Sequence, residues 1–389
     1  MSILPSLNGD SIFIKIDDYT MLIDGGYVDT FNNFIKPELL NLSSLDLSLN
    51  HLVVTHIDGD HISGIIKLLK ENNSTSFIQI ENIWHNSFKH IKEFNPNIKF
   101  KGKSVKELQV NYNLKEEQTE TTKDISSVQG STLASILFEN KYNWNAEFNG
   151  KAISIDIKTT IKLTDEITLK LLSPSNEKLS TLNKDWKKEL YQKGYSTTED
   201  LEGFSEIAFE SLVALQKEQK LLKKKNISTT GLNIDELAKS TFYEDDRSAN
   251  GSSIAFVIEY KKKKLLFLAD SHPSIIINSL KSHYNEEDFP IYFDLIKVSH
   301  HGSQNNTNLE LLKMITSQKY IFSTNGKTHN HPDKETIARI IHQKTTNVKE
   351  LFFTYPLESI EAFKNDELKQ KYNYQITEMN GSKPIKFDL

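Results

Sequence analysis

Four side chains that can bind metal ions lie within six positions of one another near the start of the chain. They are His56, Asp58, Asp60 and His61, in the stretch VVTHIDGDHISGIIKLL. Imidazoles and carboxylates beside a buried strand need partners or a cation to offset the cost of leaving water. The sequence contains no cysteine, so any metal must be held by nitrogen and oxygen ligands. We therefore expect a metal site here.

Further ligand-type residues follow later predicted strands. They are His85, Asp270, His300, His301 and His331. The carboxyl ends of the strands in an open α/β sheet share one edge, so ligands distant in sequence would converge there. Taken alone, Asp270 is also a common type of helix N-cap, and the two adjacent histidines also fit a solvated turn. A two-metal site, however, would need about three ligands beyond the first stretch.

The elements that would position these residues alternate between strands and helices. Residues 11–26 are typical of two strands joined by a turn, residues 51–56 of a buried strand, and residues 61–73 of an amphipathic helix. Further strands are expected over residues 76–86, 152–174, 252–260, 264–270, 293–299, 319–324 and 350–355, with edge strands over 374–379 and 384–389. Further helices are expected over residues 127–140, 271–284, 308–318 and 333–345.

The chain changes character between residues 178 and 246, where it is highly charged and helical in pattern. We interpret this segment as a helical insertion, a candidate lid or interaction element, within a single domain over residues 1–389. The net charge of −5 means that a nucleic-acid site would have to be a local patch. There is no run of about 18 apolar residues and no leader-like start, so a cytoplasmic protein without a membrane span is expected.

In order and spacing, these motifs resemble those of the metallo-β-lactamase family. LIDGG at Leu22–Gly26 resembles its early aspartate motif, and THIDGDH at Thr55–His61 resembles its H-x-H-x-D-H signature, with Asp58 where many members have histidine. This variant resembles the soluble domain of the competence protein ComEC, as do the stretches Asn250–Asp270, Lys297–Ser303 and Ser323–Asp333. The resemblance covers roughly residues 9 to 340, interrupted by the insertion.

The resemblance implies an α/β fold, a four-layer αβ/βα sandwich, with two divalent ions, Zn²⁺ or Mn²⁺, between the sheets. His56 and Asp58 would hold the first ion, completed by His85 or by the nearby His90. A carboxylate in place of an imidazole makes the site harder, which favours Mn²⁺ or Mg²⁺ without excluding Zn²⁺.

The same resemblance implies that Asp60 and His61 hold the second ion and that Asp270 bridges the two. Either His300 or His301 would close the second site. Asp24 would orient the ligand loop from behind the ligands. His331 would face the pocket as a phosphate contact or proton donor, so activity is expected to depend on Asp60, Asp270 and His331.

The implied function is phosphodiester hydrolysis by a metal-activated water, with DNA or RNA as substrate. Lysines at 223–225 and 261–264 could contact phosphates, although a solvated helix end and a hairpin turn are the better explanations of these two groups. One alternative is hydrolysis of a small phosphodiester, such as a cyclic nucleotide or a phosphocholine ester. Another is a metal-binding subunit of a bacterial defence complex with an ATPase partner, because stand-alone relatives resemble proteins encoded beside ATPases in such loci.

Overall fold

The computed structural model describes residues 1–91, 133–192 and 232–388, and every structural statement below refers to these residues. The six-stranded sheet contains, in spatial order, β16 (Ile385–Lys386), β1 (Ser2–Ile3), β2 (Ile12–Ile16), β3 (Tyr19–Ile23), β4 (Leu49–Val53) and β5 (Ile80–Trp84). The eight-stranded sheet contains β15 (Tyr374–Glu378), β14 (Lys349–Phe353), β13 (Lys319–Phe322), β11 (Leu295–Lys297), β9 (Lys263–Phe267), β8 (Ala255–Tyr260), β7 (Ile167–Ser173) and β6 (Thr160–Lys162). β10 (Ile291–Phe293) and β12 (Ile315–Ser317) form a separate parallel pair.

Helices cover the outer faces of both sheets, and shorter helical turns occur in the connections. The first part of the chain contains α1 (Val28–Thr30), η1 (Phe31–Ile35), α2 (Lys36–Ser44), α3 (Gly59–Thr75), α4 (Phe88–Ile91), α6 (Leu133–Glu139), η3 (Ala146–Phe148) and α7 (Asn176–Gln192). The second part contains α9 (Ile234–Ala238), α10 (Ser248–Gly251), α11 (Pro273–His283), η5 (Glu286–Asp288), η6 (Ser299–Gly302), α12 (Leu309–Met314), α13 (Lys334–His342), η7 (Glu358–Lys364) and α14 (Asp366–Tyr372).

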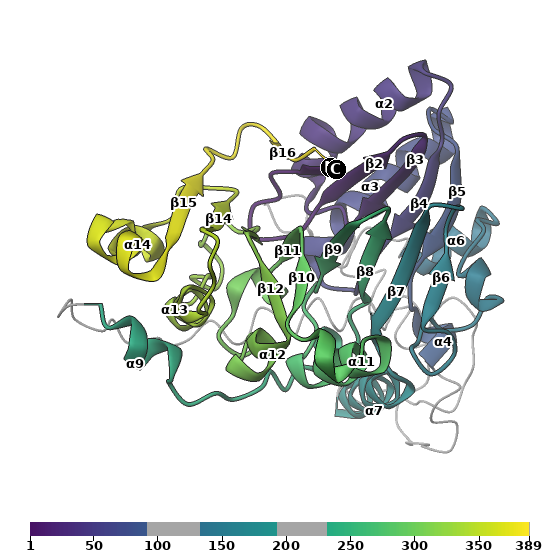
Figure 1. Ribbon diagram of the computed structural model, residues 1–389. Coiled ribbons are helices and arrows are strands. Elements are labelled where there is room, and N and C mark those ends of the chain that lie inside the picture. The colour runs from purple at the N-terminus through teal and green to yellow at the C-terminus, as the bar shows by residue number, and fades with distance from the viewer. Residues whose placement is uncertain (92–132, 193–231, 389) are drawn as a thin grey trace.

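The packing of alternate side chains produces four layers. Met21 and Ile23 of β3 lie in the apolar cluster between the two sheets, whereas Leu22 lies in the cluster formed with α2, α3 and α6. On β9, Phe267 faces the other sheet and Leu266 faces the cluster formed with α11, α12 and α13. Successive side chains of a strand point to opposite faces, so each sheet has one face against its partner and one against helices. Figure 1 shows both sheets between α2 on one side and α11 and α12 on the other. The predicted αβ/βα sandwich is confirmed.

The parallel strands of both sheets end at the same side of the sandwich. β3, β4 and β5 are mutually parallel, and so are β9, β11, β13, β14 and β15. The residues that follow β3, β4, β9 and β11 are Asp24, the Thr55–His61 stretch, Asp270 and the His300–His301 pair. Strand direction therefore brings ligand-type residues from distant parts of the chain to one edge, as the sequence predicted.

Most of the predicted elements are found, with a few differences. The strand pair over residues 11–26 and the edge strands near the C-terminus are confirmed, since β15 and β16 each lie at a sheet edge. The helix expected over residues 61–73 is longer than predicted and runs from Gly59 to Thr75. Residues 152–158 form no strand, although the alternating apolar residues predicted one. The helices α2, η7 and α14 were not predicted.

The predicted insertion is described only at its two ends. α7 begins at Asn176, and the amide of Asn183 donates a hydrogen bond to the carbonyl of Ile91 beside α4 (3.1 Å). At the other end, Ile234 and Ala238 of α9 are buried in the cluster that contains α13. The middle of the insertion, and the expected helical segments at 127–132 and 204–226, lie outside the described residues. None of the described helices is long and apolar enough to cross a membrane.

Candidate metal centre

The loop after β4 and the first turn of α3 carry the four residues of the opening stretch. All four are buried, and Asp58 stands at the N-cap of α3 in an extended conformation, with Asp60 and His61 in the first turn. The peptide dipoles at a helix N-terminus favour carboxylates at these positions. Gly9 from the preceding loop packs so closely that a β-carbon there would lie 1.8 Å from the Asp60 carbonyl oxygen. Only glycine allows this approach, so the loop before β2 packs directly against the first turn of α3.

Asp24 orders this loop through its carboxylate. One oxygen accepts the backbone N–H of Thr55 (2.8 Å), and the other accepts both the Thr55 hydroxyl (2.7 Å) and Nδ1–H of His61 (2.7 Å). Because the hydroxyl of Thr55 donates to Asp24, it accepts from Nδ1–H of His56 (3.0 Å). Asp24 therefore fixes the tautomer of both histidines, with each Nε2 free to act as a ligand atom. This is the orienting position that the sequence predicted for Asp24.

Two more histidines are fixed in the same tautomer by other partners. His300 donates from Nδ1 to the side-chain oxygen of Asn306 (2.9 Å), and His301 donates from Nδ1 to the carbonyl of Ser323 (2.8 Å). Both backbones have positive φ, 45° for His300 and 54° for His301. Two successive residues in the left-handed region let neighbouring imidazoles enter one site, a conformation that is uncommon outside functional turns.

The four Nε2 atoms surround the carboxylate of Asp270. Oδ2 lies 3.6 Å from Nε2 of His56 and 3.6 Å from that of His300. Oδ1 lies 3.7 Å from Nε2 of His61 and 3.9 Å from that of His301. These separations are too long for hydrogen bonds. In the described part of the chain, both oxygens of Asp270 and Nε2 of His56, His61 and His301 are buried without a hydrogen bond.

This arrangement fits divalent ions. Zn²⁺ lies about 2.0–2.2 Å from nitrogen and oxygen ligands, so ligand atoms 3.6–3.9 Å apart can share an ion between them. Two groups of buried ligand atoms are close enough to hold an ion, namely His56, His61 and Asp270, and Asp60, His61 and His301. The convergence of buried atoms that lack hydrogen bonds is what a metal centre requires.

The charges around the carboxylate are strongly coupled. Burial and the neighbouring His61 lower the pKa of His56 to about 4, so its imidazole is neutral at pH 7. Burial would lower the pKa of His61 as well, but Asp24 and Asp270 raise it to about 10. Burial would raise the pKa of Asp270, yet the surrounding histidines, His300 and His301 foremost, hold it well below its ordinary value. The carboxylate is thus ionised, as a bridging ligand must be.

The adjacent histidines approach different oxygens of Asp270. His301 also lies 3.7 Å from Oδ2 of Asp60, which places it with the residues predicted to hold the second ion. His300 approaches the same oxygen as His56, and Nε2 of His56 lies 3.8 Å from Oδ2 of Asp58. The geometry favours His301 over His300 for the second ion, while His300 lies on the side of the first. The individual ligand roles stay predictions.

His85 and His90 both pack against the ring of Trp144. The ring of His85 stacks on that of Trp144 with centroids 6.0 Å apart, and its backbone N–H donates to the side chain of Asn145 (3.0 Å). The ring of His90 meets Trp144 edge-on at 4.8 Å. These contacts do not decide which of the two completes the first site, so both stay predictions.

His331 lies beside the cluster. Its ring centroid is 5.4 Å from that of His300, and its Nδ1 lies 3.4 Å from Oδ2 of Asp333. Burial lowers the pKa of His331. The side chain lies next to the histidine cluster, and its role as phosphate contact or proton donor stays a prediction.

Several residues that support the centre were not recognised in the sequence. Asp245 accepts from the amides of Asn250 (2.6 Å) and Asn306 (3.2 Å), and lies 3.3 Å from Nδ1 of His300. Arg247 lies with Nη2 3.4 Å from Oδ2 of Asp58. The available signal was the polar run EDDRSANGSS just before a buried strand, but nothing local shows which of its side chains reach the site.

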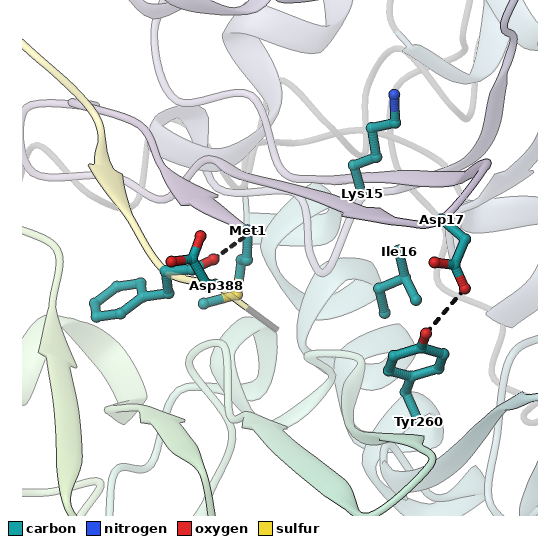
Figure 2. Close-up of a pocket in the computed structure, with 7 residues that line it drawn as sticks. Met1, Lys15, Ile16, Asp17, Tyr260 and Asp388 are labelled. Carbon is teal, nitrogen blue, oxygen red and sulfur yellow. Dashed lines mark hydrogen bonds between the residues drawn. The ribbon is translucent and has the colours of Figure 1, made fainter.

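The opposite end of the sandwich has different chemistry. The lysines at 261–264 lie around the turn between β8 and β9, whereas Asp270 follows the other end of β9. Lys263 pairs with Asp294 at 2.9 Å, so this group lies away from the cluster and is partly neutralised. A pocket of about 240 Å³ also lies here, beside Met1, Asp17 and Tyr260 (Figure 2). It is therefore separate from the candidate metal centre. The lysines at 223–225 lie outside the described residues.

Comparisons with known proteins match one family over part of the chain. A family model described as the metallo-beta-lactamase superfamily matches residues 4–83. Among solved structures, the metallo-beta-lactamase fold protein YhfI from Bacillus subtilis shares 11% identity over 96% of this chain and 88% of that chain, with a TM-score of 0.35. Zn²⁺-bound PqqB from Methylobacterium extorquens shares 8% identity over 97% of this chain and 87% of that chain, with a TM-score of 0.36. No curated protein matches.

The matched segment contains two of the motifs that form the site. It includes Asp24 and the stretch from Thr55 to His61, which the structure joins through hydrogen bonds. The finer resemblance to the ComEC soluble domain is not confirmed by these comparisons and stays a prediction. Over residues 4–83 the chain is therefore similar to the metallo-beta-lactamase superfamily.

Proposed function

We propose that this protein hydrolyses phosphodiester bonds, with nucleic acid as substrate and two divalent ions as cofactors. The observation that carries the proposal is the set of four histidines, each fixed through Nδ1, whose Nε2 atoms surround the two oxygens of Asp270. When bound, the ions would lower the pKa of a water molecule and stabilise charge on the attacking and leaving oxygens.

The residues of the chain would divide between two ions. His56 and His300 lie nearest Oδ2 of Asp270, with Asp58 3.8 Å from His56. His61 and His301 lie nearest Oδ1, with Asp60 3.7 Å from His301. The hydrogen bonds that Asp24, Asn306 and Ser323 accept from His61, His300 and His301 hold these histidines in place, so the ligand geometry is established before substrate binds. The three aspartates among the proposed ligands favour Mn²⁺, and the histidines also suit Zn²⁺.

His331 is the proposed proton donor to the leaving oxygen. It lies beside His300, and its Nδ1 is 3.4 Å from Oδ2 of Asp333. A buried histidine within reach of the reacting group is the most common general acid in enzymes. The preference for nucleic acid is supported by the resemblance of THIDGDH and KVSHHGS to the ComEC soluble domain.

The test is degradation of labelled single- and double-stranded DNA and RNA by the purified protein with Mn²⁺, Mg²⁺ or Zn²⁺. Asp270→Ala is compared with Asp165→Ala, a carboxylate whose side chain is 97% exposed on the β6–β7 turn. We expect the wild type and Asp165→Ala to cut and Asp270→Ala to be inactive. Equal cutting by Asp270→Ala would show that this centre is not the active site.

Two other results would redirect the proposal. If the wild type cleaves cyclic nucleotides or phosphocholine esters but no nucleic acid, the substrate is a small phosphodiester. If nothing is hydrolysed with any ion and an ATPase co-purifies, the protein is a metal-binding subunit of a larger complex.

A further inference from the structure

Arg247 places a cation beside the candidate metal centre. It is one of two arginines in the sequence, and the other, Arg339, is buried and donates to the carbonyls of Gln304 and Thr307. The side chain of Arg247 is 20% exposed, whereas that of Asp58 beneath it is 0% exposed. The guanidinium therefore covers Asp58 on the outer side of the cluster while part of its own surface contacts solvent.

The side chain of Arg247 uses little of its capacity for hydrogen bonds. In the described part of the chain, its one hydrogen bond runs from Nη2 to Oδ2 of Asp58, at 3.4 Å. A guanidinium has five N–H donors in a planar fork, arranged so that two edges can each bind an oxyanion. With one nitrogen on Asp58, the remaining donors are available to a second anion.

The backbone of Arg247 is held firmly, unlike that of a surface arginine. Its N–H donates to Oδ1 of Asp245 (3.0 Å), and its carbonyl accepts from Nε2 of the buried His272 (3.1 Å). The second oxygen of Asp245 lies 3.3 Å from Nδ1 of His300. One carboxylate thus fixes both a candidate ligand and the residue that carries the guanidinium, so their relative positions are set together.

An ordinary salt bridge to Asp58 accounts for only part of this arrangement. Pairing explains why a buried carboxylate is tolerated at Asp58, but it does not require a partly exposed guanidinium whose residue is anchored through both its backbone N–H and its carbonyl. A substrate phosphodiester carries one negative charge shared by two non-bridging oxygens. One of these oxygens can face the metal centre, and the other then needs a cationic donor nearby.

We propose that Arg247 binds a non-bridging oxygen of an anionic phosphate group, with Asp58 holding the guanidinium in position. This inference rests on the proposed function and adds to it a preference for anionic phosphodiesters over neutral phosphate esters. Asp58 would then have two roles. It would bind the metal ion near His56, and it would hold the guanidinium of Arg247 in position.

The test compares Arg247→Gln, Arg247→Lys and a matched control, Lys262→Gln, which removes an exposed charge at the far end of the sandwich. The substrates are bis(p-nitrophenyl) phosphate, which is anionic, and diethyl p-nitrophenyl phosphate, which is neutral and has the same leaving group. A charge-assisted hydrogen bond corresponds to roughly 10- to 100-fold in binding. We expect Arg247→Gln to lower the anionic-to-neutral ratio of kcat/KM by this factor, mainly through KM.

The other variants and a metal analysis separate recognition from structure. Arg247→Lys keeps the charge but loses the fork, so it should recover part of the ratio, and Lys262→Gln should leave the ratio unchanged. The metal content of all variants should match that of the wild type. Equal losses on both substrates, or loss of metal from Arg247→Gln, would overturn the proposal in favour of a purely structural role for Arg247.

A binding measurement keeps this test independent of the proposed function. Inorganic phosphate is titrated calorimetrically into the metal-loaded wild type and into Arg247→Gln. If the wild type hydrolyses neither ester but Arg247→Gln still weakens phosphate binding by about 10-fold or more, the hydrolytic function fails and the anion site stands. If phosphate binds both proteins equally, or does not bind the wild type, the assignment of Arg247 is wrong.

Discussion

Removing the buried Lys297–Asp10 pair one partner at a time should destabilise the protein strongly. Nζ of Lys297 on β11 lies 2.6 Å from Oδ2 of Asp10, which stands in the loop before β2, so the pair joins the two sheets. The side chains are 1% and 3% exposed. Nζ also donates to the carbonyl of Val298 (3.1 Å), and Oδ1 of Asp10 lies 3.5 Å from Nδ1 of His301.

The expected magnitude follows from this geometry. At an effective dielectric constant of about 20, two unit charges at this separation attract by about 6 kcal/mol. The desolvation of both ions offsets most of that attraction, so the pair as a whole contributes little to stability. Removing one partner leaves the other charged and buried, and typically costs about 3–5 kcal/mol. We expect Lys297→Met and Asp10→Asn each to lower the free energy of unfolding by about this amount.

The double variant decides whether this reasoning is right. Asp10→Asn/Lys297→Met leaves no unpaired charge, so it should lie within about 1–2 kcal/mol of the wild type. The assay is urea unfolding of the metal-free protein for all four combinations, analysed by linear extrapolation. If the loss in the double variant equals the sum of the single losses, the two residues do not act as a pair.

The same pair predicts the direction of a pH effect. Burial would raise the pKa of Asp10, but the Lys297 ammonium and His301 hold it below its ordinary value. A carboxyl group whose pKa is lower in the folded than in the unfolded protein contributes stability above the unfolded pKa, about 3.9 for aspartate. This contribution is lost as the pH falls further. The difference in unfolding free energy between the wild type and Asp10→Asn should therefore shrink between pH 5 and the lowest pH at which the protein is folded.

Three other predictions follow from the site and the core. Asp270→Asn removes the negative charge that four histidines surround, so it should lower the metal content measured by elemental analysis and reduce hydrolysis by about 100-fold or more. Full metal occupancy of this variant would contradict the bridging role of Asp270. Asp24→Asn should weaken metal affinity by about 10- to 100-fold in a chelator competition, and unchanged affinity would mean that the orientation of His61 does not depend on it. Burial would raise the pKa of Glu147, but hydrogen bonds with His51 and Trp84 lower it to about 2, so Glu147→Gln should lose about 1–2 kcal/mol of stability at pH 7 after allowance for its partial exposure. This loss should decrease as the pH falls from about 4.3, the unfolded pKa of glutamate, towards the folded value of about 2; a loss at pH 3 as large as that at pH 7 would contradict this.

The parts of the site that the sequence predicted are those that depend on strand ends. Asp24, His56 and Asp270 each follow a short apolar run, and strand direction alone brings such residues to one edge. The choice between His300 and His301 could not be predicted, because it depends on two left-handed backbone positions that histidine adopts only under tertiary constraint. The orienting partners of these histidines, Asn306 and Ser323, were likewise set by packing.

The unpredicted features arise from contacts between distant residues. Lys297 and Asp10 are 287 positions apart, and no local pattern links a lysine within an apolar strand to a loop aspartate. Arg247 reaches Asp58 from 189 positions away. The helix α14 was missed because it has no buried residue and hence no apolar stripe to mark it. Residues 152–158 alternate as a strand would, yet they form none in the fold, because tertiary contacts override local propensity.

The His300–His301 turn has a consequence for metal uptake. Two neighbouring residues on one turn approach opposite oxygens of the same carboxylate, and both imidazoles are already held through Nδ1 by Asn306 and Ser323. The conformational entropy of fixing the turn is therefore lost when the protein folds, not when an ion binds. Uptake of either ion would then require little further ordering of this turn.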